Sequence, residues 1–382
     1  MNISTTSKQP RFAYIDALRG YAILLVIAVH SSQYFSDLPG PIKAMADQGA
    51  RGVQLFFVAS ALTLCMSWKT RNDGLLPFYV RRLFRIAPMF WLAIVLFVAL
   101  QGVGPRYYAP DGIGTRHIAM AALFLHGLMP DTITSVVPGS WSIADEMMFY
   151  SVFPLLFLVF SRVRLVYTLI LTIAATFVCM RINRAANMYV VGLPEADRGL
   201  WATFVYLWFP QQFPCFLFGM LLYKVSMVGK PPSHRAVVAC LLTASIAALV
   251  ALPFMQSAAF ISSLGLPTTY GIVFCAYAFC LMHWQPKVLV NPIIGWIGKV
   301  SYSAYFSHFA LIQTAPMPFR LFSTSLVNYP LVFVSLTVCT IAVSSITYLL
   351  IEQPAIRLGN RLLRERTGRA SMATPLTDPS AA

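Results

Sequence analysis

Long runs without a formal charge constrain this chain more than any other feature of its sequence. Such runs cover residues 86–105, 199–223, 300–319 and 321–351, and residues 236–286 form one of 51 residues. A helix needs about 20 predominantly apolar residues to cross a bilayer. Hydrophobic residues make up 58% of the chain and charged residues 11%, against about 45–50% and about 25% in soluble proteins. The sequence therefore excludes a soluble globular protein and predicts an all-α polytopic membrane bundle.

The distribution of basic residues predicts how the chain crosses the membrane. Ten apolar segments, centred near residues 25, 60, 95, 151, 172, 212, 245, 275, 308 and 341, are candidate spans. An eleventh, residues 118–128, has only 11 residues and is too short to cross. Ten helices place 20 of the 28 basic residues on one side, with both termini in the cytoplasm, as the positive-inside rule requires. Residues 101–140 then form an external excursion whose short apolar helix suggests a lid or a re-entrant piece.

This topology divides the chain into three parts. Residues 1–14 form a cytoplasmic segment, residues 15–351 the membrane domain, and residues 352–382 a basic cytoplasmic tail that we expect to be disordered. The net charge of +15 then reflects orientation in the lipid bilayer, so no nucleic-acid partner is implied. The seven cysteines and six histidines show no metal-ligand spacing, so we expect no metal site.

Polar residues inside spanning helices are costly and therefore mark candidate functional sites. Arg19 and His30 are 11 residues apart, which puts them on one helix face, about 16 Å apart along the axis. Glu146 follows Trp141 in a helix that we expect to start at the outer face, so it lies about 8 Å below that face, at the depth of His30. We therefore predict a pair in which the carboxylate raises the basicity of the His30 imidazole. Alternatively, Arg19 snorkels to the inner headgroups, His30 only bonds a neighbouring helix, and Glu146 complements a helix dipole.

Two arginines at the cytoplasmic end of a later helix form a second candidate site. Arg82 and Arg85 are three residues apart and project from one helix face. Forked guanidinium groups bind phosphates better than lysines do, so the pair is typical of a phosphate site. A plain positive-inside anchor explains the same residues.

A third polar stretch, residues 301–308, is rich in hydroxyl groups and aromatic rings and ends in His308. These groups could simply bond neighbouring helices. His308 could also be a second polar residue of the cavity that holds His30.

Six short motifs, in this order along the chain, resemble those of acyltransferase family 3, a family of bacterial integral membrane O-acyltransferases. They are residues 15–20 followed by His30, residues 52–58, Arg82 and Arg85 with Pro88, residues 141–150 from Trp141 and Ser142 through Glu146, residues 301–308, and residues 352–354. The resemblance covers residues 12–360. Gln54 departs from the more usual aspartate, and Met147 departs from a common second acid.

The resemblance implies ten helices in the bacterial inner (plasma) membrane, an acyl-CoA donor, most often acetyl-CoA, and a hydroxyl acceptor on a carbohydrate or another cell-envelope molecule. It also implies that His30 is catalytic and that Arg82 and Arg85 serve the acyl-CoA. We assign Glu146 to orienting or stabilising His30, and Arg19 to positioning the donor. The expected substrate-binding residues are Trp141, Ser142, Tyr302 and His308.

Two other functions are compatible with these residues. A multi-pass transporter or exporter could use intramembrane His, Glu and Arg as a proton relay, although we find no inverted repeat between the two halves of the chain. Within the enzyme class, acylation of a secondary metabolite such as a macrolide stays open, because no motif identifies the acceptor.

Overall fold

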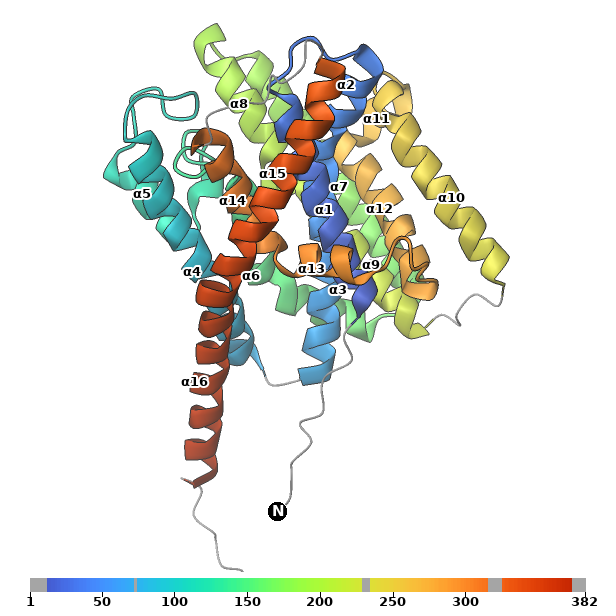
Figure 1. Ribbon diagram of the computed structural model, residues 1–382. Helices are drawn as coiled ribbons and strands as arrows, with labels where there is room; N and C mark the ends of the chain where they lie inside the picture. Colours follow the sequence, from blue (N-terminus) through green and yellow to red (C-terminus); the bar gives the residue numbers. More distant parts are fainter. Residues whose placement is uncertain (1–11, 72–73, 229–233, 315–324, 373–382) are drawn as a thin grey trace, which may run out of the picture.

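The computed structural model describes residues 12–71, 74–228, 234–314 and 325–372 (Figure 1). Within these ranges the chain contains helices and no β-strand, which confirms the predicted all-α fold. The α-helices are α1 (Ala13–Ser32), α2 (Gly40–Asp47), α3 (Gly52–Arg71), α4 (Leu75–Gln101), α5 (Thr115–Ala122), α6 (Trp141–Arg162), α7 (Leu165–Val191), α8 (Glu195–Leu207), α9 (Phe209–Val228), α10 (Arg235–Ala251), α11 (Ala259–Leu264), α12 (Leu266–His283), α13 (Pro292–Lys299), α14 (Ser301–Thr314), α15 (Ser325–Thr347) and α16 (Gln353–Met372). Shorter turns are the 3-10 helices η1 (Gln48–Arg51), η2 (His126–Leu128) and η3 (Leu252–Phe254) and the π-helix η4 (Tyr348–Glu352).

Nine helical segments of the described residues are long and apolar enough to cross a membrane. They are Ala13–Ser32, Gly40–Arg71, Leu75–Gln101, Trp141–Arg162, Leu165–Val191, Glu195–Val228, Arg235–Phe254, Leu266–His283 and Ser325–Glu365. A helix satisfies its backbone hydrogen bonds internally, which is what the bilayer core demands. These segments coincide with nine of the ten predicted spans. Residues 118–128 contribute only to α5 and η2, so they do not form a span, as predicted.

The tenth predicted span corresponds to α14, which has 14 residues. At 1.5 Å per residue it is about 21 Å long, short of a hydrocarbon core of about 30 Å. Its first residues, Ser301 and Tyr302, border a cavity inside the bundle, so α14 begins well below the surface. Residues 315–319 of the predicted span lie outside the described residues. A count of ten and the cytoplasmic position of both termini stay predictions.

The helices α1 and α3 form the centre of the bundle. The segment Gly40–Arg71 contains α3, and 72% of its most apolar 18-residue stretch is buried inside the protein. The same fraction is 22% for the peripheral α7. Helix α1 packs against α3, α13 and α15, and α3 also packs against α9 and α12. The contact between α1 and α13 is so close that a Cβ atom on Gly298 would lie 1.7 Å from the Asp16 carbonyl oxygen. The predicted site residues of α1 are therefore held on a central, immobilised helix.

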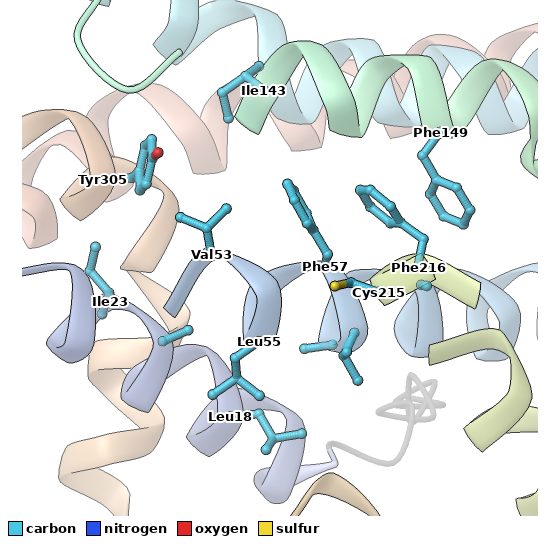
Figure 2. Close-up of a cluster of buried hydrophobic side chains, with 14 of the residues drawn as sticks. Leu18, Ile23, Val53, Leu55, Phe57, Ile143, Phe149, Cys215, Phe216 and Tyr305 are labelled. Carbon is cyan, nitrogen blue, oxygen red and sulfur yellow. The ribbon is translucent and has the colours of Figure 1, made fainter. Parts of the chain in front are cut away.

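Stacked aromatic rings fix α6 to the same centre. Phe216 of α9 stacks on Phe57 of α3 and on Phe149 of α6, with both ring-centroid distances at 4.3 Å. Figure 2 shows these three rings side by side in the space between their helices. All three residues are buried, and such pairs contribute about 0.5–1.5 kcal/mol beyond area burial.

The segment between α4 and α6 folds back into the bundle. His126 is fully buried, and its Nε2 donates to the Ser140 carbonyl oxygen at 3.0 Å. Gly139 lies directly against the rings of Tyr305 and Phe309, where a side chain would collide. Helix α6 therefore begins inside the bundle beside α14. The expectation that it starts at the outer face is wrong, because the preceding residues enter the protein before the helix begins.

The C-terminal tail is helical where it was expected to be disordered. Helix α15 continues through η4 into α16, and of the tail only residues 373–382 lie outside the described residues. Gly359 packs against Phe84 of α4, and Arg361 pairs with Glu365 one turn later. These contacts give α16 partners that the basic composition of the segment does not reveal. In Figure 1, α16 projects from the same end of the bundle at which α1 begins.

Candidate functional site

Helices α1, α3, α4, α6 and α14 surround a small inner cavity of about 60 Å³. Its polar lining consists of Arg19, Ser60, Thr63, Arg82, Arg85, Ser142, Glu146, Tyr150, Ser301, Tyr302 and Tyr305. Phe56, Phe57, Ile86 and Ile143 form much of the apolar wall. The predicted donor residues Arg19, Arg82 and Arg85 thus share one cavity with Glu146.

Glu146 is the acceptor at the centre of this cavity. Ser60 Oγ donates to Glu146 Oε1 at 2.6 Å, and the Tyr150 hydroxyl donates to the same oxygen. The carboxylate also interacts electrostatically with Arg19 and Arg82. A buried carboxylate is tolerated when hydrogen bonds and opposite charges compensate the loss of water. Glu146 therefore offsets the charge of the arginines and fixes the geometry of the inner cavity.

The three arginines are held in different ways. Arg19 donates from Nη2 to Thr63 Oγ1 at 3.1 Å. The Arg82 guanidinium lies between two rings, with its Cζ 5.8 Å from the Phe78 centroid and 6.0 Å from that of Tyr150, and its buried Nε has no hydrogen-bond partner within the described residues. Arg85 is attracted electrostatically by Glu352 and repelled by Arg19 and Arg82. Guanidinium groups gathered in this way are suited to an anionic ligand.

A second, larger cavity of about 680 Å³ lies beyond the first. His30, Arg51, Gln54, Trp141, Tyr206 and residues 104–108 and 134–135 belong to its lining. Val53 and Tyr305 border both cavities, so they form the partition between them. Tyr305 is fixed there because its hydroxyl donates to the Gly139 carbonyl oxygen at 2.9 Å and accepts from Ser142 Oγ at 3.0 Å.

His30 points into the outer cavity with a defined hydrogen bond. Its Nδ1 lies 3.1 Å from Gln33 Oε1. An amide oxygen only accepts, so Nδ1 carries the proton and Nε2 is left with a free lone pair. That arrangement is the one a general base requires. The ring also contacts Phe309 and His308, at centroid distances of 4.5 and 5.3 Å.

The predicted contact between His30 and Glu146 is wrong. His30 borders the outer cavity and bonds Gln33, whereas Glu146 borders the inner cavity and bonds Ser60 and Tyr150. Trp141, at the start of α6, already borders the cavity of His30. Glu146 is five residues further along α6 and so lies about 7.5 Å deeper. The depth estimate failed because it assumed that α6 begins at the outer face.

The expected substrate-binding residues occupy three different places. Trp141 borders the outer cavity, while Ser142 and Tyr302 border the inner one. The Tyr302 hydroxyl donates to the Ile86 carbonyl oxygen at 2.7 Å. His308 is fully buried, and its Nδ1 donates to the Ala304 carbonyl oxygen at 2.9 Å. It lies behind the His30 ring and outside the lining of both cavities.

Three residues in or beside the two cavities were missed by sequence reasoning. Ser60 and Thr63 line the inner cavity from α3, and Gln33 follows the end of α1 outside both linings. Only their contacts with Glu146, Arg19 and His30 reveal them. The three-residue spacing of His30 and Gln33 was the one signal that could have identified this partner, which lies at the C-cap of α1. Within the part of the chain that the structure describes, no group of three His, Cys, Asp or Glu side chains could hold a metal ion.

Comparison with known proteins decides the family of this chain. The sequence model of a family described as an acyltransferase domain, acyltransferase 3, matches residues 12–349. The chain belongs to the acyltransferase 3 family. That match covers every helix that contributes to the two cavities. No solved structure matches the chain.

Three named relatives of this acyltransferase 3 chain illustrate the range of the family. The exopolysaccharide production protein ExoZ of Rhizobium meliloti (strain 1021) is 31% identical over 28% of this chain and 33% of its own length. The protein named "Putative O-acetyltransferase SACOL0978", from Staphylococcus aureus (strain COL), is 24% identical over 80% of this chain and 52% of its own length. Acyltransferase MdmB of Streptomyces mycarofaciens is 26% identical over 44% of this chain and 46% of its own length. The chain thus spans about half or less of the length of these relatives.

Proposed function

We propose that this protein is a membrane O-acyltransferase that moves an acetyl or another short acyl group from acyl-CoA to a hydroxyl group of a cell-envelope or exported carbohydrate. One observation carries the proposal. The inner cavity is lined by arginines, the outer cavity is lined by His30, and the two cavities share the lining residues Val53 and Tyr305. The donor and the acceptor each have a chemically distinct compartment, and a single partition separates them.

The inner cavity supplies the donor side of the reaction. Arg82 and Arg85 bind phosphate groups of the acyl-CoA, and Arg19 positions its thioester end. Glu146 is itself held by Ser60 and Tyr150, and its carboxylate offsets the charge of Arg19 and Arg82. In this proposal Glu146 is a positioning residue for the donor site, which revises its expected role as the partner of His30.

The outer cavity supplies the base and the acceptor. His30 Nε2 removes the proton from an acceptor hydroxyl, and the oxygen attacks the thioester carbonyl carbon at the level of Tyr305. The carbon–sulfur bond then breaks, the acyl group stays on the acceptor oxygen, and the CoA sulfur takes the proton back from His30. Gln33 keeps the required tautomer of His30 and stabilises the imidazolium that forms.

Carbohydrate is the favoured acceptor for two reasons. Trp141, Tyr107 and Tyr206 give the outer cavity aromatic faces, and Gln54 and Gln101 give it amide groups, a combination suited to a polyhydroxylated ring. Among the relatives, the name of ExoZ refers to exopolysaccharide production. MdmB is named an acyltransferase without an acceptor, and acylation of a secondary metabolite such as a macrolide is the alternative within the enzyme class. We place the protein in the bacterial inner membrane, with both termini in the cytoplasm.

Release of CoA thiol tests the proposal directly. Purified protein is supplied with acetyl-CoA, with and without a polysaccharide fragment, and free thiol and acetylated product are both measured. We expect thiol release that depends on acceptor, matches the product one to one and is lost in His30→Ala. A transporter would move solute without consuming the thioester, and that result would overturn the proposal. A macrolide acceptor offered in parallel distinguishes the two acceptor classes.

A further inference from the structure

One arginine of the outer cavity takes no part in the mechanism above. Arg51 is the last residue of η1, immediately before α3, and it borders the outer cavity together with His30. Only 8% of its surface is exposed. Arginine is almost never buried to this degree without a partner for its charge.

The structure gives Arg51 no such partner among the described residues. Its Cζ lies 5.3 Å from the centroid of the Tyr206 ring, but no carboxylate oxygen of these residues lies within 4.0 Å of it, and its buried Nε makes no hydrogen bond to them. Asp47, one turn earlier, is already paired with Lys43. A cation–π contact compensates only part of the cost of taking a guanidinium group out of water.

The other arginine of the cavity differs in this respect. Arg106 donates to Gln101 Oε1, to the Gly102 carbonyl oxygen at 2.6 Å and to the Ser135 carbonyl oxygen at 3.4 Å. Its donors therefore hold the loop that forms the cavity wall. Arg51 is the cavity arginine whose forked donors are not used by the described part of the protein, so a ligand can take them.

We propose that the outer cavity accepts a carbohydrate with an anionic group, a carboxylate or a phosphate, and that Arg51 binds this group while a neighbouring hydroxyl of the same molecule reaches His30. This inference rests on the proposed function for the role of His30, but the binding of the anion does not require acyl transfer. A bidentate guanidinium contact with an anion adds orientation as well as affinity. Arg51 would thus select both the class of acceptor and the hydroxyl that is acylated.

Binding of matched glycosides without acyl-CoA tests the proposal. Affinities of the purified protein for p-nitrophenyl glucuronide, for the neutral p-nitrophenyl glucoside and for glucose 6-phosphate are measured by calorimetry. The first and third probes distinguish a carboxylate from a phosphate source. We expect at least one anionic probe to bind about tenfold or more tightly than the neutral one, as a charge-assisted bond into a buried site predicts.

Three variants test whether Arg51 causes the preference for the anionic probe. Arg51→Gln should remove the preference for the anion, Arg51→Lys should keep only part of it, and Arg106→Gln, which removes an equal charge from the same cavity, should keep it. Equal binding of anionic and neutral probes by the wild-type protein overturns the inference, and this comparison needs no folded variant. A preference that survives in folded Arg51→Gln overturns it as well.

The same samples are assayed for CoA thiol release, which separates the two proposals. Transfer to neutral and anionic acceptors at equal rates, unaffected by Arg51→Gln, would leave the proposed function standing and refute the anion site. Binding of the anion that depends on Arg51, without any transfer, would refute the proposed function and leave the anion site standing.

Discussion

The chemistry of His30 is set by its immediate neighbours. Gln33 lies at the C-cap of α1, immediately after the helix, and fixes the proton on Nδ1, while His308 and Phe309 enclose the ring from α14. The Gln33 side-chain amide is neutral, so it orients the His30 imidazole without adding a negative charge beside it. The partner predicted from depth, Glu146, instead belongs to the arginines of the inner cavity.

Replacement of His30 tests its role as the base. A general base contributes about 10²–10⁴-fold to a rate, so His30→Ala should lower acyl transfer by about that factor while acyl-CoA still binds. Gln33→Leu should cause a smaller loss, because the ring remains but its tautomer is no longer fixed. Thiol release and acyl-CoA affinity are measured on the same folded samples. Near-parental transfer by His30→Ala would contradict the mechanism.

Arg82 and Arg85 allow a conservative test of the donor site. Lysine keeps the charge but loses the forked geometry of guanidinium, so the Arg82→Lys, Arg85→Lys double variant should bind acyl-CoA about tenfold more weakly or worse. A pair of plain membrane anchors would tolerate the change. Arg81→Lys, on the same turn of α4 but outside the lining of both cavities, is the matched control and should bind acyl-CoA normally.

The sequence identified the charged residues of the inner cavity, but it predicted neither that Glu146 lies with the arginines nor which neutral residues contact them. Arg19, Arg82, Arg85 and Glu146 were all identified, because charges inside apolar helices are rare enough to be read directly. Ser60 and Thr63 were not, because hydroxyl residues are common in such helices and only packing shows which one faces a charge. The His30–Glu146 error has the same origin, since the depth of a helix start depends on how the preceding loop folds.

At the scale of elements, the close packing of α13 on α1 fixes the site. Gly20 and Gly298 face each other across this contact, and a Cβ atom on either would lie within 3 Å of a backbone oxygen of the other helix. Small residues at such positions let two helices approach closely. The sequence indicates a glycine after Arg19 but cannot indicate its partner 278 residues later.

Two glycines of α13 make this contact testable. Gly298→Ala places a Cβ atom 1.7 Å from the Asp16 carbonyl oxygen, and overpacking of this kind costs about 1–3 kcal/mol. We expect a lower melting temperature and weaker acyl-CoA binding, because α1 carries Arg19. Gly295→Ala is the control, since a Cβ atom there meets nothing within 4 Å and alanine favours the helix. Equal melting temperatures in the two variants would contradict the packing argument.

The folded-back segment before α6 depends on a neutral histidine. Burial lowers the pKa of His126 to about 4, against about 6.5 in an unfolded chain. Between these values the unfolded state binds more protons than the folded state, so stability falls as the pH is lowered from about 6.5 toward 4. We expect this loss to be smaller in His126→Gln, whose amide can still donate to the Ser140 carbonyl oxygen. Melting curves of both proteins from pH 7 to pH 4 measure the difference, and identical pH profiles would contradict the role given to His126.

At the scale of the whole molecule, two cavities in series run through the bundle. The inner one lies at the level of the arginines of α1 and α4, and the outer one lies at the level of His30, Trp141 and the loops before α6. Arg19 and His30 are 11 residues apart on α1, so the two levels are separated by about 16 Å along the axis of α1. In the proposed function, the long flexible chain of an acyl-CoA can extend from the level of Arg19 toward the level of His30, which a compact substrate cannot do.

This arrangement predicts that donor and acceptor are used from opposite sides of the membrane. We expect the basic end of the bundle, where α16 projects (Figure 1), to be cytoplasmic by the positive-inside rule, and acyl-CoA is charged and cannot cross a bilayer. In sealed vesicles of known orientation, radiolabelled acetyl-CoA should support transfer only when it faces α16, and the acetylated product should collect in the opposite compartment. Val53→Phe, which enlarges a side chain of the partition between the cavities, should lower transfer while acyl-CoA and acceptor each still bind. Product that appears in the compartment of the donor would show instead that both substrates enter from one side, and the two cavities would then not be a path across the membrane.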